Sequence, residues 1–246
     1  MSKNKTLNQS RGQILRAAER LFAANGFSGT GVDAIAQEAG INKATIYYYF
    51  TSKQAILDCL IEDFLQNFML KTLSILENKE TATLLTQSIS ASEDFILIND
   101  KPSIQRMLGF LDGWLDHLMN LFSENRDILR IMFAESVKDG ENQQLLFRLS
   151  DLIASNVSEY HQRLSGLGYP KLNLETIIMK FFGGILPIAY YAICSDAWAS
   201  HYDMTEQALR QGLRSLFHIE ILGYYEWALS HLVEQKPHGE DSSCRN

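Results

Sequence analysis

Cationic, hydroxyl-bearing and aromatic side chains are concentrated between residues 43 and 53. If residues 43–50 form a helix, with about 100° between successive side chains, Ile46 and Phe50 share one face that points inward. The rest of the helix then offers a cation, hydroxyls and aromatic rings, which can bind phosphate oxygens and base edges. These outward residues are Lys43, Ala44, Thr45, Tyr47, Tyr48 and Tyr49. Lys53 follows at the start of the next helix, where its ammonium and the free backbone N–H groups could both meet a phosphate.

Two helices precede this segment and must position it. Each has the spacing of a capping box at its start, and each ends at a glycine, which accepts the left-handed conformation. The signals are Ser10 with Gln13 and Thr30 with Asp33 as starts, and Asn25-Gly26 and Gly40 as ends. A short helix, a turn containing glycine and a second short helix form a helix-turn-helix, although an ordinary small helical bundle has the same pattern.

Charge is unevenly distributed along the chain of 246 residues, whose net charge is −7. Residues 1–53 contain seven basic and three acidic residues, a net charge of +4, whereas the remainder carries −11. A basic end joined to an acidic body is expected when only that end meets phosphate, although surface charge also drifts in proteins that bind no nucleic acid.

The N-terminal quarter of the chain resembles the TetR/AcrR family of transcriptional regulators over residues 11–65. The motifs that carry the resemblance are Gly26-Phe27, Thr30-Gly31-Val32-Asp33-Ala34-Ile35-Ala36, Ala39-Gly40-Ile41, Thr45-Ile46-Tyr47-Tyr48-Tyr49-Phe50 and Ser52-Lys53. Many family members carry a second Thr or Ser that touches phosphate where this chain has Gly31, so that contact is in doubt, while Thr30 remains beside it as an expected DNA contact.

The resemblance implies an all-α dimer with an N-terminal three-helix DNA-binding domain and a larger C-terminal domain for ligand binding and dimerisation. We therefore expect a helix-turn-helix DNA-binding domain at 1–52, with 1–9 as a flexible arm. An effector-binding and dimerisation domain is expected at 53–235, and a disordered tail at 236–246. The patterns predict body helices at 52–77, 81–98, 103–122, 125–137, 141–164, 174–194 and 204–234. The helix at 81–98 is one more than family members usually have.

Apolar residues recur every three or four positions along the last predicted helix. The helix before it is apolar nearly all round and contains Gly183-Gly184, so it must bury more than one face. A stripe of this kind is usually internal core, but here it also indicates a homodimer interface, and the resemblance points to the same two helices. The interface residues expected on the last helix are Leu209, Leu213, Leu216, Phe217 and Tyr224.

Aromatic residues and methionines are frequent in the middle of the body, where most must be plain core. Such adaptable side chains also suit a cavity for an apolar or amphipathic small molecule, whose identity the sequence does not give. The expected effector-pocket residues are Phe64, Phe68, Phe110, Trp114, His117 and Phe133, with His161 and Glu135 as further polar candidates.

Enzymatic and metal-binding motifs are absent from the sequence. It has no GxSxG, no phosphate loop and no HExxH motif, and its three cysteines have no ligand spacing. Asp112 and Asp116 lie one helical turn apart, which is usually a solvated face. We therefore expect no catalysis, metal or cofactor. The most apolar stretch, 181–194, is interrupted by glycines and a proline, so we also expect no membrane association and a cytoplasmic location.

These features predict a ligand-responsive repressor that binds a palindromic DNA operator as a homodimer. An activator, or a DNA-organising protein of the same fold without an effector, remains open. The long helix that begins at Ser52 connects the DNA-binding segment to the aromatic body, so we expect it to transmit the response to a ligand.

Overall fold

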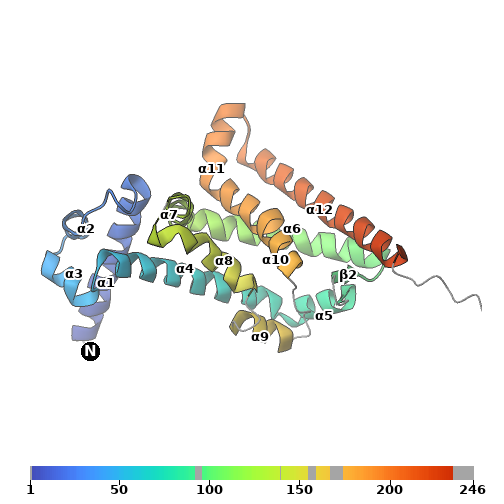
Figure 1. Ribbon diagram of the computed structural model, residues 1–246, viewed down its shortest axis with the longest axis horizontal. Helices are drawn as coiled ribbons and strands as arrows, with labels where there is room; N and C mark the ends of the chain where they lie inside the picture. Colours follow the sequence, from blue (N-terminus) through green and yellow to red (C-terminus); the bar gives the residue numbers. More distant parts are fainter. Residues whose placement is uncertain (1, 92–95, 139, 155–158, 167–173, 235–246) are drawn as a thin grey trace, which may run out of the picture.

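The computed structural model describes residues 2–91, 96–138, 140–154, 159–166 and 174–234. The molecule is elongated, with α1–α3 at one end and the remaining helices forming the body (Figure 1). The fold is all-α, as predicted, apart from one two-stranded hairpin. The tail at 236–246 lies outside the described residues.

The DNA-binding end consists of α1 (Ser2–Asn25), α2 (Val32–Ala39) and α3 (Lys43–Tyr49). Because α1 begins at Ser2, the expected flexible arm is helical from residue 2 onward, and Ser10 lies inside the helix rather than at its cap. The second capping box is also wrong, since Gly31 is the N-cap of α2 and makes no side-chain cap bond. Both glycine ends are confirmed, at φ +74° for Gly26 and +67° for Gly40.

Helix α4 (Lys53–Leu76) connects this end to the body, as predicted. The Ser52 side chain caps it by accepting a hydrogen bond from the Ala55 amide at 3.1 Å. Its 24 residues span about 36 Å at about 1.5 Å per residue. The helix therefore runs from the DNA-binding end along much of the body (Figure 1).

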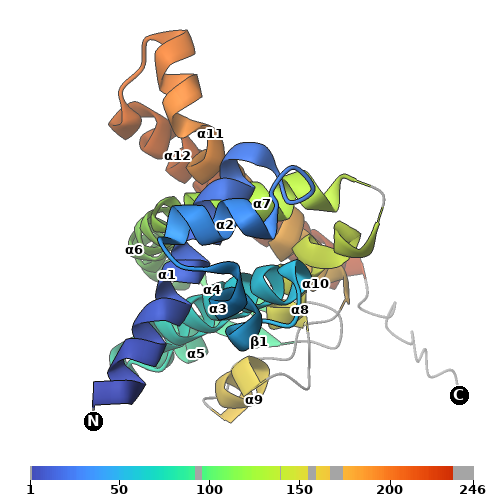
Figure 2. The same ribbon diagram turned by 90° about the vertical axis from the view of Figure 1, so that its left-hand side faces the viewer.

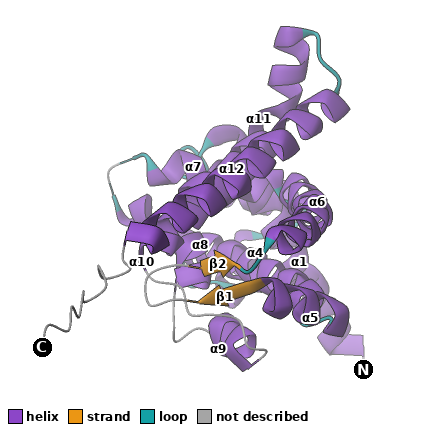
Figure 3. Ribbon diagram, turned by 90° about the vertical axis from the view of Figure 1, so that its right-hand side faces the viewer, coloured by secondary structure: helices purple, strands orange, loops and turns teal. Residues whose placement is uncertain are grey.

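The predicted helix at 81–98 is wrong over its second half. Helix α5 (Lys79–Ser88) ends there, and β1 (Ile89–Ala91) pairs antiparallel with β2 (Ile96–Ile98) in the register Ile89↔Ile98 (Figure 3). The run Ile96-Leu97-Ile98 is rich in β-branched residues, which favour extended backbone. The Asn99 amide closes the hairpin by donating to the Ser88 carbonyl at 3.0 Å.

The remaining helices follow the predicted order with altered boundaries. The segment expected as one helix at 141–164 is divided, and the helix expected at 174–194 continues to Tyr202 through a π-helical turn at its glycine pair. The elements are α6 (Lys101–Glu124), α7 (Arg126–Ser136), η1 (Glu141–Gln144), α8 (Leu145–Ala154), α9 (Glu159–Gly166), α10 (Leu174–Met179), η2 (Lys180–Ile185), α11 (Leu186–Tyr202) and α12 (Glu206–Glu234).

A continuous cluster of buried apolar side chains extends from Ile14 in α1 to Phe217 in α12. It passes from the DNA-binding end through α4 into the body, where Phe68 stacks on Phe122 of α6 with ring centroids 5.5 Å apart. Helices α11 and α12 pack on this body through α6 (Figures 1 and 3).

One described helical run, Ile177–Tyr202, is long and apolar enough by composition to cross a membrane, with a mean hydropathy of 1.7. The expectation that glycine and proline interrupt this stretch is wrong, because the helix passes through both. A core helix of a soluble protein meets the same criterion. Here the run packs against α6, α7 and α12.

Candidate nucleic-acid interface

Helix α3 presents most of its predicted outward side chains to solvent. Tyr47 and Tyr48 are 52% and 72% exposed, whereas Ile46 and Phe50 are buried, as the helical rotation requires. Figure 2 shows this end of the molecule, with α2 and α3 toward the viewer. Tyr49 differs from the prediction, since it is half-buried against the core and meets the Tyr48 ring edge-on at 5.0 Å.

The start of α3 is fixed by a side-chain cap. Asn42 Oδ1 accepts hydrogen bonds from both the backbone N–H and the hydroxyl of Thr45, each at 2.8 Å. Lys43 and Ala44 are exposed, and Thr45 is half-buried. The N-terminal turn of α3 is therefore held rigidly while its outer side chains stay accessible.

Lys43 is paired with Asp33 of α2. Its ammonium lies 2.9 Å from Oδ1 and 3.0 Å from Oδ2 of the carboxylate. The hydrogen bond to Asp33 and the attraction of its charge raise the pKa of Lys43. The sequence indicated Asp33 as a helix cap only, and no local pattern pointed to this pair.

Thr30 and Lys53 point into the protein rather than toward solvent. The Thr30 side chain is buried, and its hydroxyl donates to the carbonyls of Gly26 at 2.9 Å and Leu21 at 3.1 Å. The Lys53 ammonium donates to the carbonyls of Phe27 at 2.7 Å and Thr30 at 2.9 Å. In the structure both groups fasten the Gly26–Thr30 turn that joins α1 to α2, and their expected contacts with DNA remain predictions.

Glu135 of α7 holds the same turn from the body. Its side chain is buried, and Oε1 accepts from the Phe27 amide at 3.3 Å and from the Lys138 ammonium at 2.5 Å. Glu135 was expected near an effector, whereas the structure places it at the joint with the DNA-binding end. The Gly26–Thr30 turn is thus bonded to both α4 and α7.

Comparison with known proteins shows the family to which the chain belongs. Residues 14–60 match the family model described as bacterial regulatory proteins, tetR family. The uncharacterized HTH-type transcriptional regulator YdgC of Bacillus subtilis (strain 168) is 30% identical over 180 residues, which cover 72% of this chain and 77% of YdgC. The chain belongs to the TetR family. It is therefore a DNA-binding transcriptional regulator and not an enzyme.

Two further comparisons concern a shorter segment of the chain and its fold. The uncharacterized HTH-type transcriptional regulator YerO of the same organism is 36% identical over 93 residues, which cover 36% of this chain but only 32% of YerO. A solved structure described as a TetR-family transcriptional regulator from Mesorhizobium loti MAFF303099 has a TM-score of 0.52 at 16% identity. It covers 89% of this chain and 96% of that one, which shows a shared fold.

Four of the residues expected to line an effector pocket belong to the core cluster of this TetR-family body or pack against it, namely Phe64, Phe68, Trp114 and Phe133. Phe64 and Phe68 are buried and pack on Phe122, whereas Phe133 is partly buried against the core. On α6, Trp114 stacks between Phe110 at 5.9 Å and His117 at 6.1 Å. Burial and the nearby Lys71 lower the pKa of His117, and its Nε2 has no partner among the described residues. The His161 side chain lies outside the described part of the chain.

The apolar stripe of α12 divides between two faces. Leu209 and Leu213 are partly buried against the core and Phe217 is buried in it, while their expected place in a dimer interface remains a prediction. Leu216 is 49% exposed and Tyr224 is half-buried. The outward apolar residues of the last two helices include Tyr190, Trp198, Tyr202, Leu216, Ile219 and Leu222.

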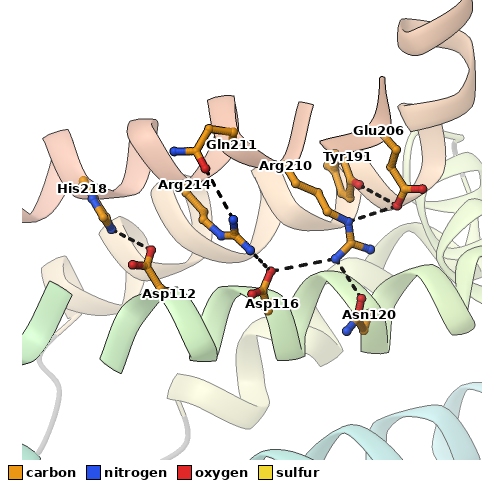
Figure 4. A network of polar contacts seen from close by, with 9 residues as sticks. All are labelled: Asp112, Asp116, Asn120, Tyr191, Glu206, Arg210, Gln211, Arg214 and His218. Carbon is orange, nitrogen blue, oxygen red and sulfur yellow. Dashed lines mark hydrogen bonds and ion pairs between the residues drawn. The ribbon is translucent and has the colours of Figure 1, made fainter. Parts of the chain in front are cut away.

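A row of polar contacts joins α12 to α6 (Figure 4). His218 Nε2 lies 2.9 Å from Asp112 Oδ1, Arg214 pairs with Asp116, and Arg210 donates to Asn120 at 2.9 Å. Asp116 is thus an ion-pair partner of Arg214, and Asp112 is a hydrogen-bond partner of His218. This row fixes the register of α12 against the body.

Proposed function

We propose that this TetR-family regulator is a ligand-responsive repressor that binds a palindromic operator as a homodimer. The observation that carries the DNA-binding part is the exposed face of α3, where Lys43, Tyr47 and Tyr48 reach solvent around a capped first turn. We call α3 the recognition helix. The acidic body of the protein would repel DNA, so the DNA must approach the end formed by α1–α3. Such a protein acts beside the chromosome, and we propose a cytoplasmic location without a membrane partner.

Binding-site selection from randomised duplexes tests this function. A dimer with two recognition helices should enrich a palindrome whose half-site centres lie about 34–36 Å apart, or a multiple of that distance. Thr45→Ala should change the preferred bases, because Thr45 lies in the first turn of α3. Tyr48→Phe should weaken binding to all DNA sequences alike, because it removes a hydroxyl that would contact a phosphate. Failure to enrich any sequence would contradict the proposal.

The selected site also tests the sign of regulation. When it is placed over a promoter that drives a reporter, a repressor lowers expression, and deletion of the gene restores it. A rise in expression instead would identify an activator. Binding at many chromosomal sites without a ligand response would identify a DNA-organising protein.

An apolar or amphipathic effector is proposed to act on α4. This helix carries Phe64 and Phe68 on its inner face, and its first residue, Lys53, is bonded to the Gly26–Thr30 turn. A displacement of α4 by a ligand would therefore move the DNA-binding end directly. Thermodynamic linkage requires operator DNA to weaken the affinity for such a ligand by the same factor as the ligand weakens DNA binding. Calorimetry with and without operator tests this, and equal affinities would contradict it.

A further inference from the structure

The ion pair between Lys43 and Asp33 lies on the surface that the recognition helix presents. Lys43 is the first residue of α3, and Asp33 is in the first turn of α2, so the pair spans the helix-turn-helix. The carboxylate contacts the ammonium through both oxygens, at 2.9 and 3.0 Å. The two side chains are 49% and 79% exposed, so both are accessible to a DNA duplex.

This arrangement places a negative charge where DNA must approach. Exposed ion pairs contribute little to stability, so the pair is poorly explained as a structural tie. Its effect on DNA binding is larger, because a free surface lysine binds any phosphate and releases counterions regardless of sequence. A lysine that is neutralised by an aspartate offers no such net charge. Moving it to a phosphate would leave an unpaired carboxylate beside a polyanion.

We propose that Asp33 is a specificity-determining residue of this regulator, which holds Lys43 away from the phosphates and keeps it for base edges. The inference rests on the proposed function, since it needs the α3 face to meet DNA. The ammonium has three N–H donors, so it can keep its contact with Asp33 and still donate to guanine O6 or N7 in the major groove. Such a contact carries sequence information that phosphates lack. Asp33 therefore lowers affinity for arbitrary DNA while sparing the selected site.

Glu38 provides a matched control on the same helix. It is paired with Arg20 of α1 at 2.9 Å and is 42% exposed, so Glu38→Gln removes one charge from a comparable ion pair. It lies five residues after Asp33, about 140° further around α2, and so acts on another face. The two variants have the same net charge and differ in where the change lies.

The experiment measures the affinity of Asp33→Asn and Glu38→Gln for a random-sequence duplex of fixed length over a series of salt concentrations. Asp33→Asn should steepen the dependence of log K on log salt by about 0.9, the value for one added phosphate contact. A fourfold rise in salt then lowers its affinity by about 3.5-fold more than that of the unchanged protein. Its preference for the selected site over random DNA should fall, while Glu38→Gln keeps the original slope and preference.

The double variant Asp33→Asn with Lys43→Gln identifies the cation. In this double variant the slope of log K against log salt should be no steeper than that of the unchanged protein, because the ammonium that Asp33→Asn frees has been removed. An Asp33→Asn slope equal to that of Glu38→Gln, or an extra slope that survives in the double variant, would overturn the role of Asp33. If the unchanged protein binds neither random nor selected duplexes, the proposed function fails first, which distinguishes the two failures. Thermal melts confirm that each variant is folded.

Discussion

The ammonium of Lys53 lies between two backbone carbonyls of the Gly26–Thr30 turn and 4.3 Å from the centre of the Phe27 ring. Lys53→Met keeps the aliphatic stem over the ring but removes both hydrogen bonds. We expect it to lower the free energy of unfolding by about 1–3 kcal/mol, since bonds from a charged donor are lost. The slope of log K against log salt should not change, because the lysine is already occupied. Chemical denaturation and a salt series measure the two quantities.

Lys71→Met is the matched control for this change. Lys71 also lies on α4 but forms an ion pair with Glu124 at 3.0 Å on the surface, so its loss should cost less than about 1 kcal/mol. A salt slope flattened by about 0.9 in Lys53→Met would show instead that this lysine reaches a phosphate.

Residue-level prediction from the sequence succeeded where helical rotation decides exposure. Ile46 and Phe50 are buried and Tyr47 and Tyr48 exposed, because the 3.6-residue period alone separates them. It did not reveal the partners of Lys53, which are backbone carbonyls in a distant turn. Those carbonyls leave no pattern in the side chains, so a cation beside a DNA-binding helix looked like a phosphate ligand.

At the scale of elements, α7 is bonded to the DNA-binding end through Glu135. Glu135→Gln keeps the size and an acceptor but removes the charge that attracts the Phe27 amide and Lys138. We expect the Gly26–Thr30 turn to open more often, so that its amides exchange hydrogen about tenfold faster for each 1.4 kcal/mol lost. Hydrogen exchange followed by mass spectrometry measures this in the whole protein.

Glu124→Gln is the control, because it removes a carboxylate from another part of the body. It breaks the surface pair with Lys71 and should leave exchange in the turn unchanged. If Glu135→Gln also leaves that exchange unchanged, Glu135 does not hold the turn, and the bonds from Lys53 of α4 fasten it instead.

Element boundaries were predictable where a cap or glycine marks them, as at Ser52 for α4 and Gly40 for α2. The hairpin after Ser88 was not, because a serine-rich stretch lacks a strong period of either kind. The continuity of the helix through Gly183-Gly184 was also missed. There the Glu220 carboxylate of α12 lies beside Gly183, at the place where a Cβ would stand, within a helix that continues through the glycine pair.

At the scale of the whole molecule, the outward residues of α11 and α12 give a sharper test of dimerisation than the stripe predicted from the sequence. Ile219 is 68% exposed on α12. Ile219→Asp should yield a folded monomer, because a buried charge would have to be desolvated in the interface. Sedimentation measures the mass, and circular dichroism measures the helix content.

Two other substitutions serve as controls for Ile219→Asp. Leu70→Asp changes a residue that is 56% exposed on α4 and should leave the dimer intact. Phe217→Asp should unfold the protein, since Phe217 is 6% exposed. A dimeric Ile219→Asp would contradict an interface on this face. Spacing alone identified the apolar stripe of α12 but gave no indication of which leucines face α6 and which face outward.

The fastening of the Gly26–Thr30 turn has a consequence for how regulators of this kind recombine. Lys53 and Glu135, which hold the turn, both lie after α3 in the chain. A gene crossover between α3 and α4 would therefore take the turn from one parent and both of its holders from the other. The bonds to the two backbone carbonyls and to the Phe27 amide survive such an exchange only if the second parent supplies a cation and a carboxylate at the same places. Operator specificity can thus be transplanted cleanly only along with these two residues.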